Sequence, residues 1–260
     1  MELGLRDRVV LVTGGSRGIG LACARAFLEE GARVAIASRN RGHLDRAAAE
    51  LASNGRAVSF VADLSRPEDA ASLANRVEKQ LAPIDVLVNC AGAARRYLPE
   101  ALDVDAWHAA MDAKYFTYVH AMEAVLPRMR ERRHGAVVNV IGTGGKVATP
   151  THLPGGAANA ALMLASTGLA SVYGRFGVRI NAINPGQTMT DRVKELLALE
   201  ARSRGVPEAQ VLEELRARVP LGRLAEPDDV AALAAFLASD KAAYLTGVIV
   251  PMDGGLTPVI

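Results

Sequence analysis

Short apolar runs alternate with longer stretches of helical spacing along nearly the whole chain, and this alternation limits the fold more than any other feature. The apolar runs lie at residues 8–13, 33–38, 57–61, 86–89, 136–141, 179–184 and 248–251. Helical spacing is clearest at residues 21–30, 43–52, 67–81, 107–132, 157–173 and 227–238. Repeated strand and helix units predict a doubly wound parallel sheet of the α/β class, with helices on both faces.

Length and charge limit the possible organisation and partners. The chain has 260 residues and a net charge of +2, so we interpret residues 1–260 as a single domain without an electrostatic preference for nucleic acid or a membrane surface. No long apolar run precedes the first strand, which argues against a signal peptide or membrane span. The two cysteines, Cys23 and Cys90, have no metal-ligand spacing. We therefore expect a soluble, cytoplasmic protein without a metal that acts on a small molecule.

The first strand leads directly into a glycine-rich turn, T-G-G-S-R-G-I-G at residues 13–20. Glycines at this spacing let the backbone turn tightly and approach a pyrophosphate, whose charge is met by free N–H groups and by the helix dipole. The turn follows an N-terminal strand and opens a helix, and this context favours dinucleotide binding over a purely structural turn.

Together with this turn, three further motifs resemble those of the classical short-chain dehydrogenases/reductases (SDRs). N-C-A-G at residues 89–92 resembles the family's N-N-A-G, and P-G-Q-T-M-T at residues 185–190 resembles its P-G-x-x-x-T. The segment from residue 221 to residue 255 resembles its C-terminal block. The resemblance covers essentially the whole chain. It implies a three-layer αβα Rossmann fold, an oxidoreductase activity on a carbonyl or alcohol, and a homotetramer or homodimer.

The resemblance also assigns cofactor positions residue by residue. In the turn, the expected contacts are Gly14, Ser16, Arg17, Gly18, Ile19 and Gly20, and Arg39 follows the second strand. Asp63 and Leu64 are expected beside the adenine, and Asn89, Ala91 and Gly92 near a ribose. Pro185, Gly186 and Thr188 are expected near the nicotinamide amide, followed by Thr190.

Charge at two of these positions indicates which dinucleotide is bound. An acidic residue at the end of the second strand would bond the adenosine ribose and repel a 2′-phosphate, whereas arginine attracts that phosphate. Here the strand ends in Ala37-Ser38-Arg39, and Arg17 stands inside the turn. We therefore predict NADP(H) in preference to NAD(H). The alternative is that both arginines are merely solvated surface charges.

The resemblance implies an unusual catalytic site. The family keeps a serine at the end of the fifth strand, a tyrosine thirteen residues later and a lysine four residues beyond that. Counting from V-V-N-V at residues 137–140, these positions hold Gly142, Gly155 and Asn159. Segments that resemble the family on both sides fix this register. We therefore expect a divergent member that lacks the usual Ser-Tyr-Lys residues.

A fourth family position, an asparagine on the helix before the fifth strand, falls on Lys114. Lysine and asparagine have thus exchanged places relative to the family. Hydride transfer to a carbonyl leaves an oxyanion that needs a proton. Lys114 and His152 are the candidate catalytic residues, with Thr143 and Lys146 nearby. The alternatives are that Lys114 reaches solvent, that Asn159 only packs, and that His152 is a surface residue.

Three functions remain open at this point. The first is an NADP(H)-dependent SDR oxidoreductase with a non-standard proton donor. The second is a catalytically inactive homologue, a structural or regulatory cofactor-binding subunit that could pair with an active homologue. The third is a non-redox lyase or isomerase on the same scaffold. The charged stretch at residues 190–219 predicts a helical lid, and Lys114, Lys146, Arg95 and Arg96 leave an anionic substrate open.

Overall fold

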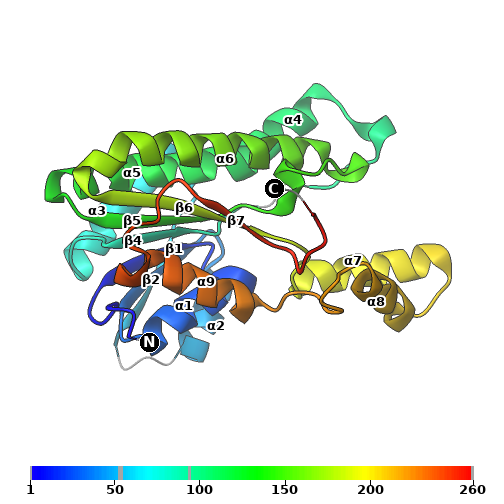
Figure 1. The fold of residues 1–260 in the computed structure, drawn as a ribbon, viewed down its shortest axis with the longest axis horizontal. Coiled ribbons are helices and arrows are strands. Elements are labelled where there is room, and N and C mark those ends of the chain that lie inside the picture. Colours follow the sequence, from blue (N-terminus) through cyan, green and yellow to red (C-terminus); the bar gives the residue numbers. More distant parts are fainter. Residues whose placement is uncertain (1, 52–54, 93–94, 259–260) are drawn as a thin grey trace.

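One parallel sheet forms the centre of the molecule (Figure 1). The computed structural model describes residues 2–51, 55–92 and 95–258. Seven strands lie in the order β3-β2-β1-β4-β5-β6-β7, which confirms the doubly wound α/β fold. Their bounds are β1 (Val9–Thr13), β2 (Arg33–Ser38), β3 (Ala57–Val61), β4 (Val86–Asn89), β5 (Gly135–Val140), β6 (Val178–Pro185) and β7 (Ile249–Met252). From β1 to β3 the strands are added toward one side of the sheet, and from β4 to β7 toward the other. Folds of this kind bind ligands at the point between β1 and β4 where the strand order changes direction.

Helices cover both faces of this sheet and complete the three layers (Figure 1). The helices are α1 (Gly18–Glu29), α2 (Arg41–Leu51), α3 (Pro67–Gln80), α4 (Val104–Ala110), α5 (Thr117–Arg132), α6 (Leu153–Tyr173), α7 (Asp191–Arg204), α8 (Glu208–Ala217) and α9 (Pro227–Ala238). Helices α1, α2 and α9 contribute to one apolar core, and α3, α5 and α6 contribute to the other. Of the predicted helix at 43–52, residue 52 lies outside the described residues, and α6 begins four residues earlier than predicted.

Successive side chains of β1 alternate between the two apolar cores, and this explains why the strand sequences are apolar at every position. Val9 and Leu11 belong to the core beneath α3 and α5, whereas Val10 and Val12 belong to the core beneath α1 and α9. All four side chains are at most 1% exposed. Successive side chains of a strand point to opposite faces, so a strand covered on both sides needs apolar residues at every position.

The helix predicted at residues 107–132 is present, but the chain makes a π-helical turn within it. Helix α4 ends at Ala110, the π turn spans Met111–Phe116, and α5 begins at Thr117. Gly92 packs against this turn with φ +107°, and a Cβ there would collide with the carbonyl of Ala113. A π turn adds one residue to a helical turn and rotates the following side chains, which the apolar periodicity could not reveal.

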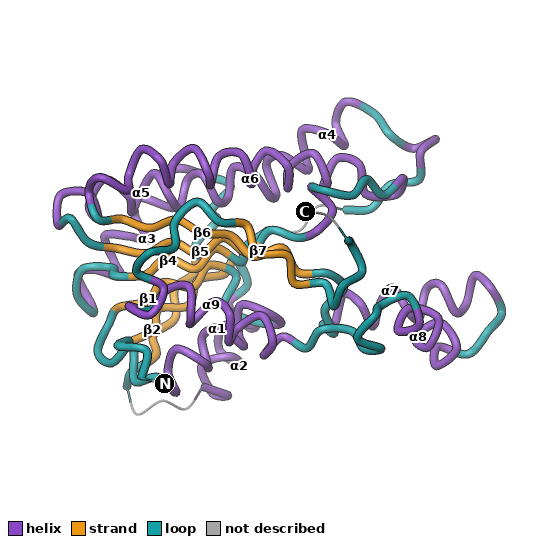
Figure 2. The backbone as a smooth tube through the Cα atoms, in the orientation of Figure 1, coloured by secondary structure: helices purple, strands orange, loops and turns teal. Residues whose placement is uncertain are grey.

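Residues 190–219, where the sequence predicts a helical lid, contain two helices, and these project from the body of the molecule (Figures 1 and 2). Helices α7 and α8 share a small apolar cluster of their own that includes Leu197 and Val211. The Arg204 guanidinium joins the two helices by donating to both carboxylate oxygens of Glu214, at 2.6 and 2.8 Å. The segment is therefore helical, and its role as a lid stays a prediction.

Arg179 on β6 connects the sheet to the end of α9. Its guanidinium donates to the carbonyl oxygens of Leu237, Ala238, Ser239 and Leu245 at 2.7, 3.1, 3.0 and 3.3 Å respectively. The last carbonyl groups of a helix have no partner within the helix, so a cation here satisfies them and interacts favourably with the helix dipole.

We expect Arg179→Met to lower the free energy of unfolding by about 3 kcal/mol, because it leaves these carbonyl groups without charged donors. Urea denaturation would measure the change. Arg202→Met is the matched control, since among the described residues the Arg202 guanidinium bonds only to the Ala198 carbonyl of its own helix. Equal stability of the two variants would contradict the role given to Arg179.

Candidate cofactor and catalytic site

The glycine-rich turn is packed too tightly for side chains. Gly14 and Gly18 adopt φ +67° and +55°, and a Cβ on Gly14 would lie 2.8 Å from the backbone of Ala91. A Cβ on Gly20 would collide with the carbonyl of Gly14. Helix α1 therefore begins close against the turn, with no side-chain cap and no acidic residue in its first turn. Its first N–H groups remain available for an anion such as a pyrophosphate.

Two arginine side chains, one inside the turn and one just after β2, are available for a ligand. Arg17 and Arg39 are both exposed, and neither guanidinium has a hydrogen bond or ion pair to another described residue. The N–H of Gly14 donates to the carbonyl of Ala37 at 2.8 Å, which ties the turn to the end of β2. Arg39 follows two residues later, so both arginines lie at the same corner of the sheet.

A network of hydrogen bonds between buried polar side chains lies next to the start of the turn. Thr13 Oγ1 donates to Asn89 Oδ1 at 3.2 Å, Asn89 Nδ2 donates to Asn139 Oδ1 at 3.0 Å, and Asn139 Nδ2 donates to Ser166 Oγ at 2.9 Å. The Thr13 hydroxyl also accepts from the backbone N–H of Ala91 at 3.3 Å. The chain links the carboxyl ends of β1, β4 and β5 to α6. The Asn89 amide is used within this network, and its predicted contact with a ribose stays a prediction.

The other expected cofactor residues lie along the same edge of the sheet. Thr190 lies next to the turn, since its Cγ2 is 3.3 Å from the Cβ position of Gly18. Thr188 donates to the carbonyl of Gly186 at 3.3 Å. Asp63 accepts from the hydroxyl of Ser65 at 2.8 Å. The segments that carry the predicted contacts therefore lie along one edge of the sheet. The remaining residues of the predicted set are Ser16, Ile19, Leu64, Gly92 and Pro185. Contacts of all these residues with a nucleotide stay predictions.

Lys114 is buried at the end of β5. Its side chain is 8% exposed, so the alternative that it reaches solvent is wrong. The Nζ atom donates to Tyr118 Oη at 2.8 Å and to the carbonyl of Val140 at 3.1 Å, and the Tyr118 hydroxyl donates to the same carbonyl. Burial lowers the pKa of Lys114 to about 7, and the positive charge of Arg192 acts in the same direction. Near neutral pH this amine can both give and take a proton.

His152 lies directly before α6 and is half-buried. Its Nδ1 atom is buried and has no hydrogen-bond partner among the described residues. Burial lowers the pKa of His152, and the positive charges of Arg96, Arg192 and Lys114 lower it further. The imidazole is therefore neutral at pH 7. Arg192 was not singled out by the sequence, because nothing in the pattern of the lid shows that its first turn faces these groups.

The three residues that the resemblance assigns to the family's catalytic positions also lie near one another. Gly142 follows β5 with φ +126°, and Gly155 is buried in the first turn of α6. Asn159 is 5% exposed, and its Nδ2 atom is 3.3 Å from the Cβ position of Gly142 and 3.6 Å from that of Gly144. Lys114 therefore contacts the end of β5 from the π turn, while Asn159 faces the following glycines from α6. Lys146 is exposed.

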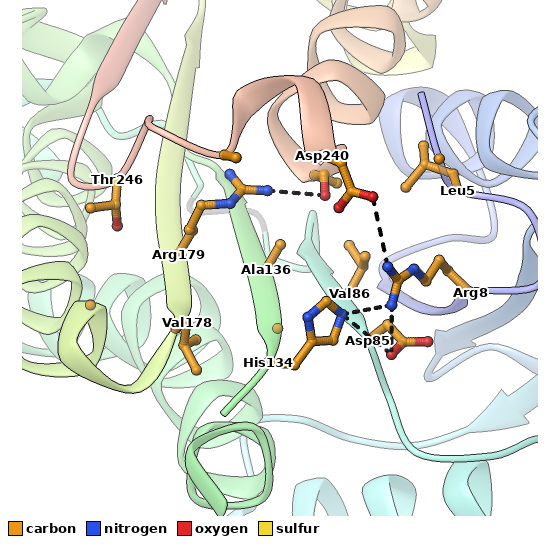
Figure 3. Close-up of a pocket in the computed structure, with 16 residues that line it drawn as sticks. Leu5, Arg8, Asp85, Val86, His134, Ala136, Val178, Arg179, Asp240 and Thr246 are labelled. Carbon is orange, nitrogen blue, oxygen red and sulfur yellow. Dashed lines mark hydrogen bonds and ion pairs between the residues drawn. The ribbon is translucent and has the colours of Figure 1, made fainter. Parts of the chain in front are cut away.

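A cavity of about 310 Å³ lies at the opposite edge of the sheet (Figure 3). Its charged groups are already matched: Arg8 bonds to His134 Nε2 at 2.8 Å and lies 3.8 Å from both Asp85 and Asp240. The predicted cofactor residues lie at the carboxyl ends of the strands, whereas this cavity lies at their amino ends. It is therefore separate from the candidate site.

In the described part of the chain, every helix is too short or too polar to span a bilayer. No group of three His, Cys, Asp or Glu side chains within residues 2–51, 55–92 and 95–258 is arranged to hold a metal ion.

Comparison with known proteins decides the family. A family model described as enoyl-(acyl carrier protein) reductase matches residues 14–257. The chain belongs to the short-chain dehydrogenases/reductases. This SDR is 35% identical to 2-(S)-hydroxypropyl-CoM dehydrogenase 3 of Xanthobacter autotrophicus over 98% of each chain. It is also 35% identical to 4-formylbenzenesulfonate dehydrogenase of Comamonas testosteroni, over 97% of this chain and 99% of that protein.

A solved structure supports both the fold and the cofactor class. The L-sorbose reductase of Gluconobacter frateurii, crystallised with NADPH and L-sorbose, is 27% identical to this SDR. The two superpose with a TM-score of 0.94 over 100% of each chain. The chain is thus an SDR-type oxidoreductase by family. The NADPH in the neighbour supports binding of a nicotinamide cofactor, and the place of that cofactor at the glycine-rich turn stays a prediction.

We expect the stability of the protein to rise with pH above 7 because of Lys114. The unfolded chain keeps the Lys114 proton up to about pH 10.5, whereas the folded chain loses it at about pH 7. The cost of burying the ammonium is therefore complete below pH 7 and decreases as the pH rises. Relative to Lys114→Met, the wild type should gain about 2 kcal/mol between pH 7 and pH 9, measured by urea denaturation. Parallel pH profiles would contradict the lowered pKa.

Proposed function

We propose that this SDR uses NADP(H) to interconvert a carbonyl compound and its alcohol, with Lys114 as the proton donor and acceptor. The observation that carries the proposal is the buried Lys114 amine, which lies at the end of β5 with a pKa of about 7. A general acid or base is most effective when its pKa lies near the working pH. The names of the relatives, which are dehydrogenases and a reductase, support the reaction class.

The residues around the turn fit a phosphorylated dinucleotide. The glycines leave room for a pyrophosphate at the start of α1, and Arg17 and Arg39 supply two uncommitted guanidinium groups beside it. A guanidinium can bind phosphate through two parallel hydrogen bonds. When bound, NADPH supplies a hydride, and the chain's own residues then have to supply the proton. The NADPH in the sorbose reductase structure supports the same choice of cofactor.

The catalytic part of the proposal rests on the register of the family's motifs. In that register Gly142 and Gly155 replace the hydroxyl and the phenol, and Asn159 replaces the ammonium. Neither glycine can stabilise an oxyanion with a side chain. Lys114 offers the missing cation from the opposite helix, and the Asn159 amide can donate a hydrogen bond to the same space.

Lys114 can act in both directions of the reaction. During reduction, the ammonium form donates a proton to the oxyanion as it develops. During oxidation of the alcohol, the neutral amine accepts the hydroxyl proton. The hydrogen bonds from Nζ to Tyr118 Oη and to the Val140 carbonyl hold the amine in place between these events. His152 is the weaker candidate for the acid, because its lowered pKa keeps it neutral at pH 7.

The choice of dinucleotide can be tested by neutralising each arginine. We expect Arg17→Gln and Arg39→Gln each to weaken NADPH binding about tenfold or more, since each removes a charged partner of the 2′-phosphate. NADH binding should stay within about twofold. Fluorescence titration of both nucleotides would measure the change, with Arg46→Gln on the exposed face of α2 as the control. Equal losses for NADPH and NADH would show that the arginines do not read the phosphate.

The role of Lys114 can be tested with NADPH and a panel of ketones, aldehydes and quinones. We expect Lys114→Met to lower kcat at least a hundredfold, because it removes the only proton carrier of this proposal. His152→Gln should have a smaller effect. The reduction rate of the wild type should fall as the pH rises through about 7, as the ammonium form is lost.

Measurements of NADPH binding, made beside the activity assays, distinguish the oxidoreductase from the two alternative functions. Unchanged NADPH affinity in Lys114→Met would show that the variant folds. Tight NADPH binding by the wild type without turnover of any compound would favour an inactive homologue. Activity that persists without the nucleotide would favour a lyase or isomerase. Full activity of Lys114→Met would contradict the proposal for this residue.

A further inference from the structure

The carboxamide of Asn159 is a buried polar group without a partner. Asn159 lies in the second turn of α6 and is 5% exposed. Neither the oxygen nor the nitrogen of its side chain has a hydrogen bond to another described residue. Buried polar groups in folded proteins nearly always have such a bond, because they have lost their contacts with water. The amide therefore lacks a partner that a ligand can supply.

The amide is also open to a small molecule. In the described chain, the unpaired side-chain atoms that are fully enclosed are Nδ1 of His152 and Oε1 of Gln187. The Asn159 amide is not among them, so the small exposed part of this residue includes its polar atoms. A ligand that enters the candidate site can reach this amide without a rearrangement of the protein.

The amide faces the space that Gly142 leaves empty. Its Nδ2 atom lies 3.3 Å from the Cβ position of Gly142. Among the described residues, no other atom outside the adjoining chain lies within 4 Å of that position. Gly142 has φ +126°, which residues with a side chain rarely adopt, so the space stays free of a side chain. The amide thus stands at the edge of an open space.

Close packing of the glycine segment on α6 fixes this arrangement. A Cβ on Gly145 would lie 2.7 Å from the backbone nitrogen of Ala160, and one on Gly156 would lie 2.7 Å from the carbonyl oxygen of Gly144. Neither glycine therefore admits a side chain without a shift of the backbone. Two backbones in direct contact hold the amide beside the open space, so the amide is in place before a ligand binds.

The chemistry of the amide favours a hydroxyl group as its partner. A carboxamide presents a donor and an acceptor side by side, and a hydroxyl both accepts and donates. A hydroxyl therefore suits the amide in either orientation of the side chain, whereas a carboxylate only accepts and an ammonium only donates. The His152 ring presents its Cδ2 carbon to Gly144, 3.3 Å from the Cβ position, and this carbon is not a polar atom. The amide determines which polar group fits on this side.

Asn159 and Lys114 contact the same end of β5. Lys114 Nζ donates to the carbonyl of Val140, and Asn159 faces Gly142 two residues later. Two residues of extended chain span at most about 7 Å. A hydrogen bond of about 3 Å from each side chain leaves only a short separation between the two groups of a ligand. These lengths fit a hydroxyl on the carbon next to the reacting one.

We propose that Asn159 binds a hydroxyl group of the substrate on the carbon next to the reacting carbonyl, so that the substrate is an α-hydroxy ketone or α-hydroxy aldehyde. The proposal rests on the oxidoreductase function above and adds the substrate class. In the reduction, the carbonyl carbon gains a hydride from NADPH and its oxygen gains the Lys114 proton, which leaves a vicinal diol and NADP⁺. A compound without the hydroxyl leaves the buried amide unpaired, and such sites discriminate strongly against it.

Binding to the NADP⁺-loaded protein tests the site without turnover, because the oxidised cofactor cannot reduce a ketone. The probes are 2-hydroxyacetophenone and propiophenone, which differ by a hydroxyl in place of a methyl group. We expect the hydroxy ketone to bind to the wild type tenfold or more tightly by calorimetry. Equal binding of the two ketones by the wild type would overturn the proposal.

Variants then assign this preference to the amide. Asn159→Leu removes the amide at similar volume, and Asn159→Ala removes it with a smaller side chain, should leucine not fit. Each should lower the preference for the hydroxy ketone about tenfold. Thr167→Val is the matched control on the same helix, because the Thr167 hydroxyl donates to the carbonyls of Met163 and Gly247. Urea denaturation identifies the folded variants, and an unchanged preference in these would overturn the proposal.

NADPH titration of the same variants decides which molecule carries the hydroxyl, because the riboses of the cofactor carry hydroxyl groups as well. We expect the NADPH affinity of the folded Asn159 variants to stay within about threefold of the wild type. A larger loss of NADPH affinity, with the preference between the ketones unchanged, would assign the amide to the cofactor and contradict the proposal.

Turnover separates this proposal from the oxidoreductase function. A binding preference that depends on Asn159, in a protein that reduces neither ketone with NADPH, would support the hydroxyl site and contradict the reaction. Reduction of both ketones, with a ratio of kcat/KM values that is the same in the wild type and in the Asn159 variants, would support the reaction and contradict the hydroxyl site. The variants supply the baseline for the different intrinsic reactivity of the two ketones.

Discussion

The chain of hydrogen bonds from Thr13 through Asn89 and Asn139 to Ser166 is the interaction on which the candidate site depends. It links three neighbouring strands and α6 at the carboxyl edge of the sheet, where the glycine-rich turn begins. All four side chains are at most 1% exposed, so each one would be costly without its partner. The network therefore fixes the relative positions of the turn, the N-C-A-G segment and α6.

The π turn at Met111–Phe116 is the second constraint on the site. It directs Lys114 toward the end of β5, where burial beside Tyr118 and the Val140 carbonyl lowers the pKa of the amine. Gly92 allows this turn to pack directly against the N-C-A-G segment. The cofactor edge and the proposed proton donor are thus parts of one packed unit, and a change in either would disturb the other.

Sequence reasoning located the elements well and their interruptions poorly. The seven strands lie within a residue or so of their predicted positions, because a strand buried on both faces leaves a continuous apolar run. The π turn was missed since α4 and α5 keep helical spacing on either side of it. For the site, the sequence named Lys114 and His152 but left their exposure open. It missed Arg192, whose charge acts on both groups only because of where α7 begins in the fold.

The sequence by itself determined the fold, the family and the position of the glycine-rich turn, since these depend on local patterns: apolar runs, glycine spacing and short motifs. It also determined that glycine, glycine and asparagine stand at residues 142, 155 and 159. Only the tertiary structure decided that Lys114 is buried with a pKa of about 7 and that the charges of Arg96 and Arg192 both act on His152. The physical reason is that burial and electrostatic fields arise from residues far apart in the chain, which come together only when the helices and loops pack on the sheet.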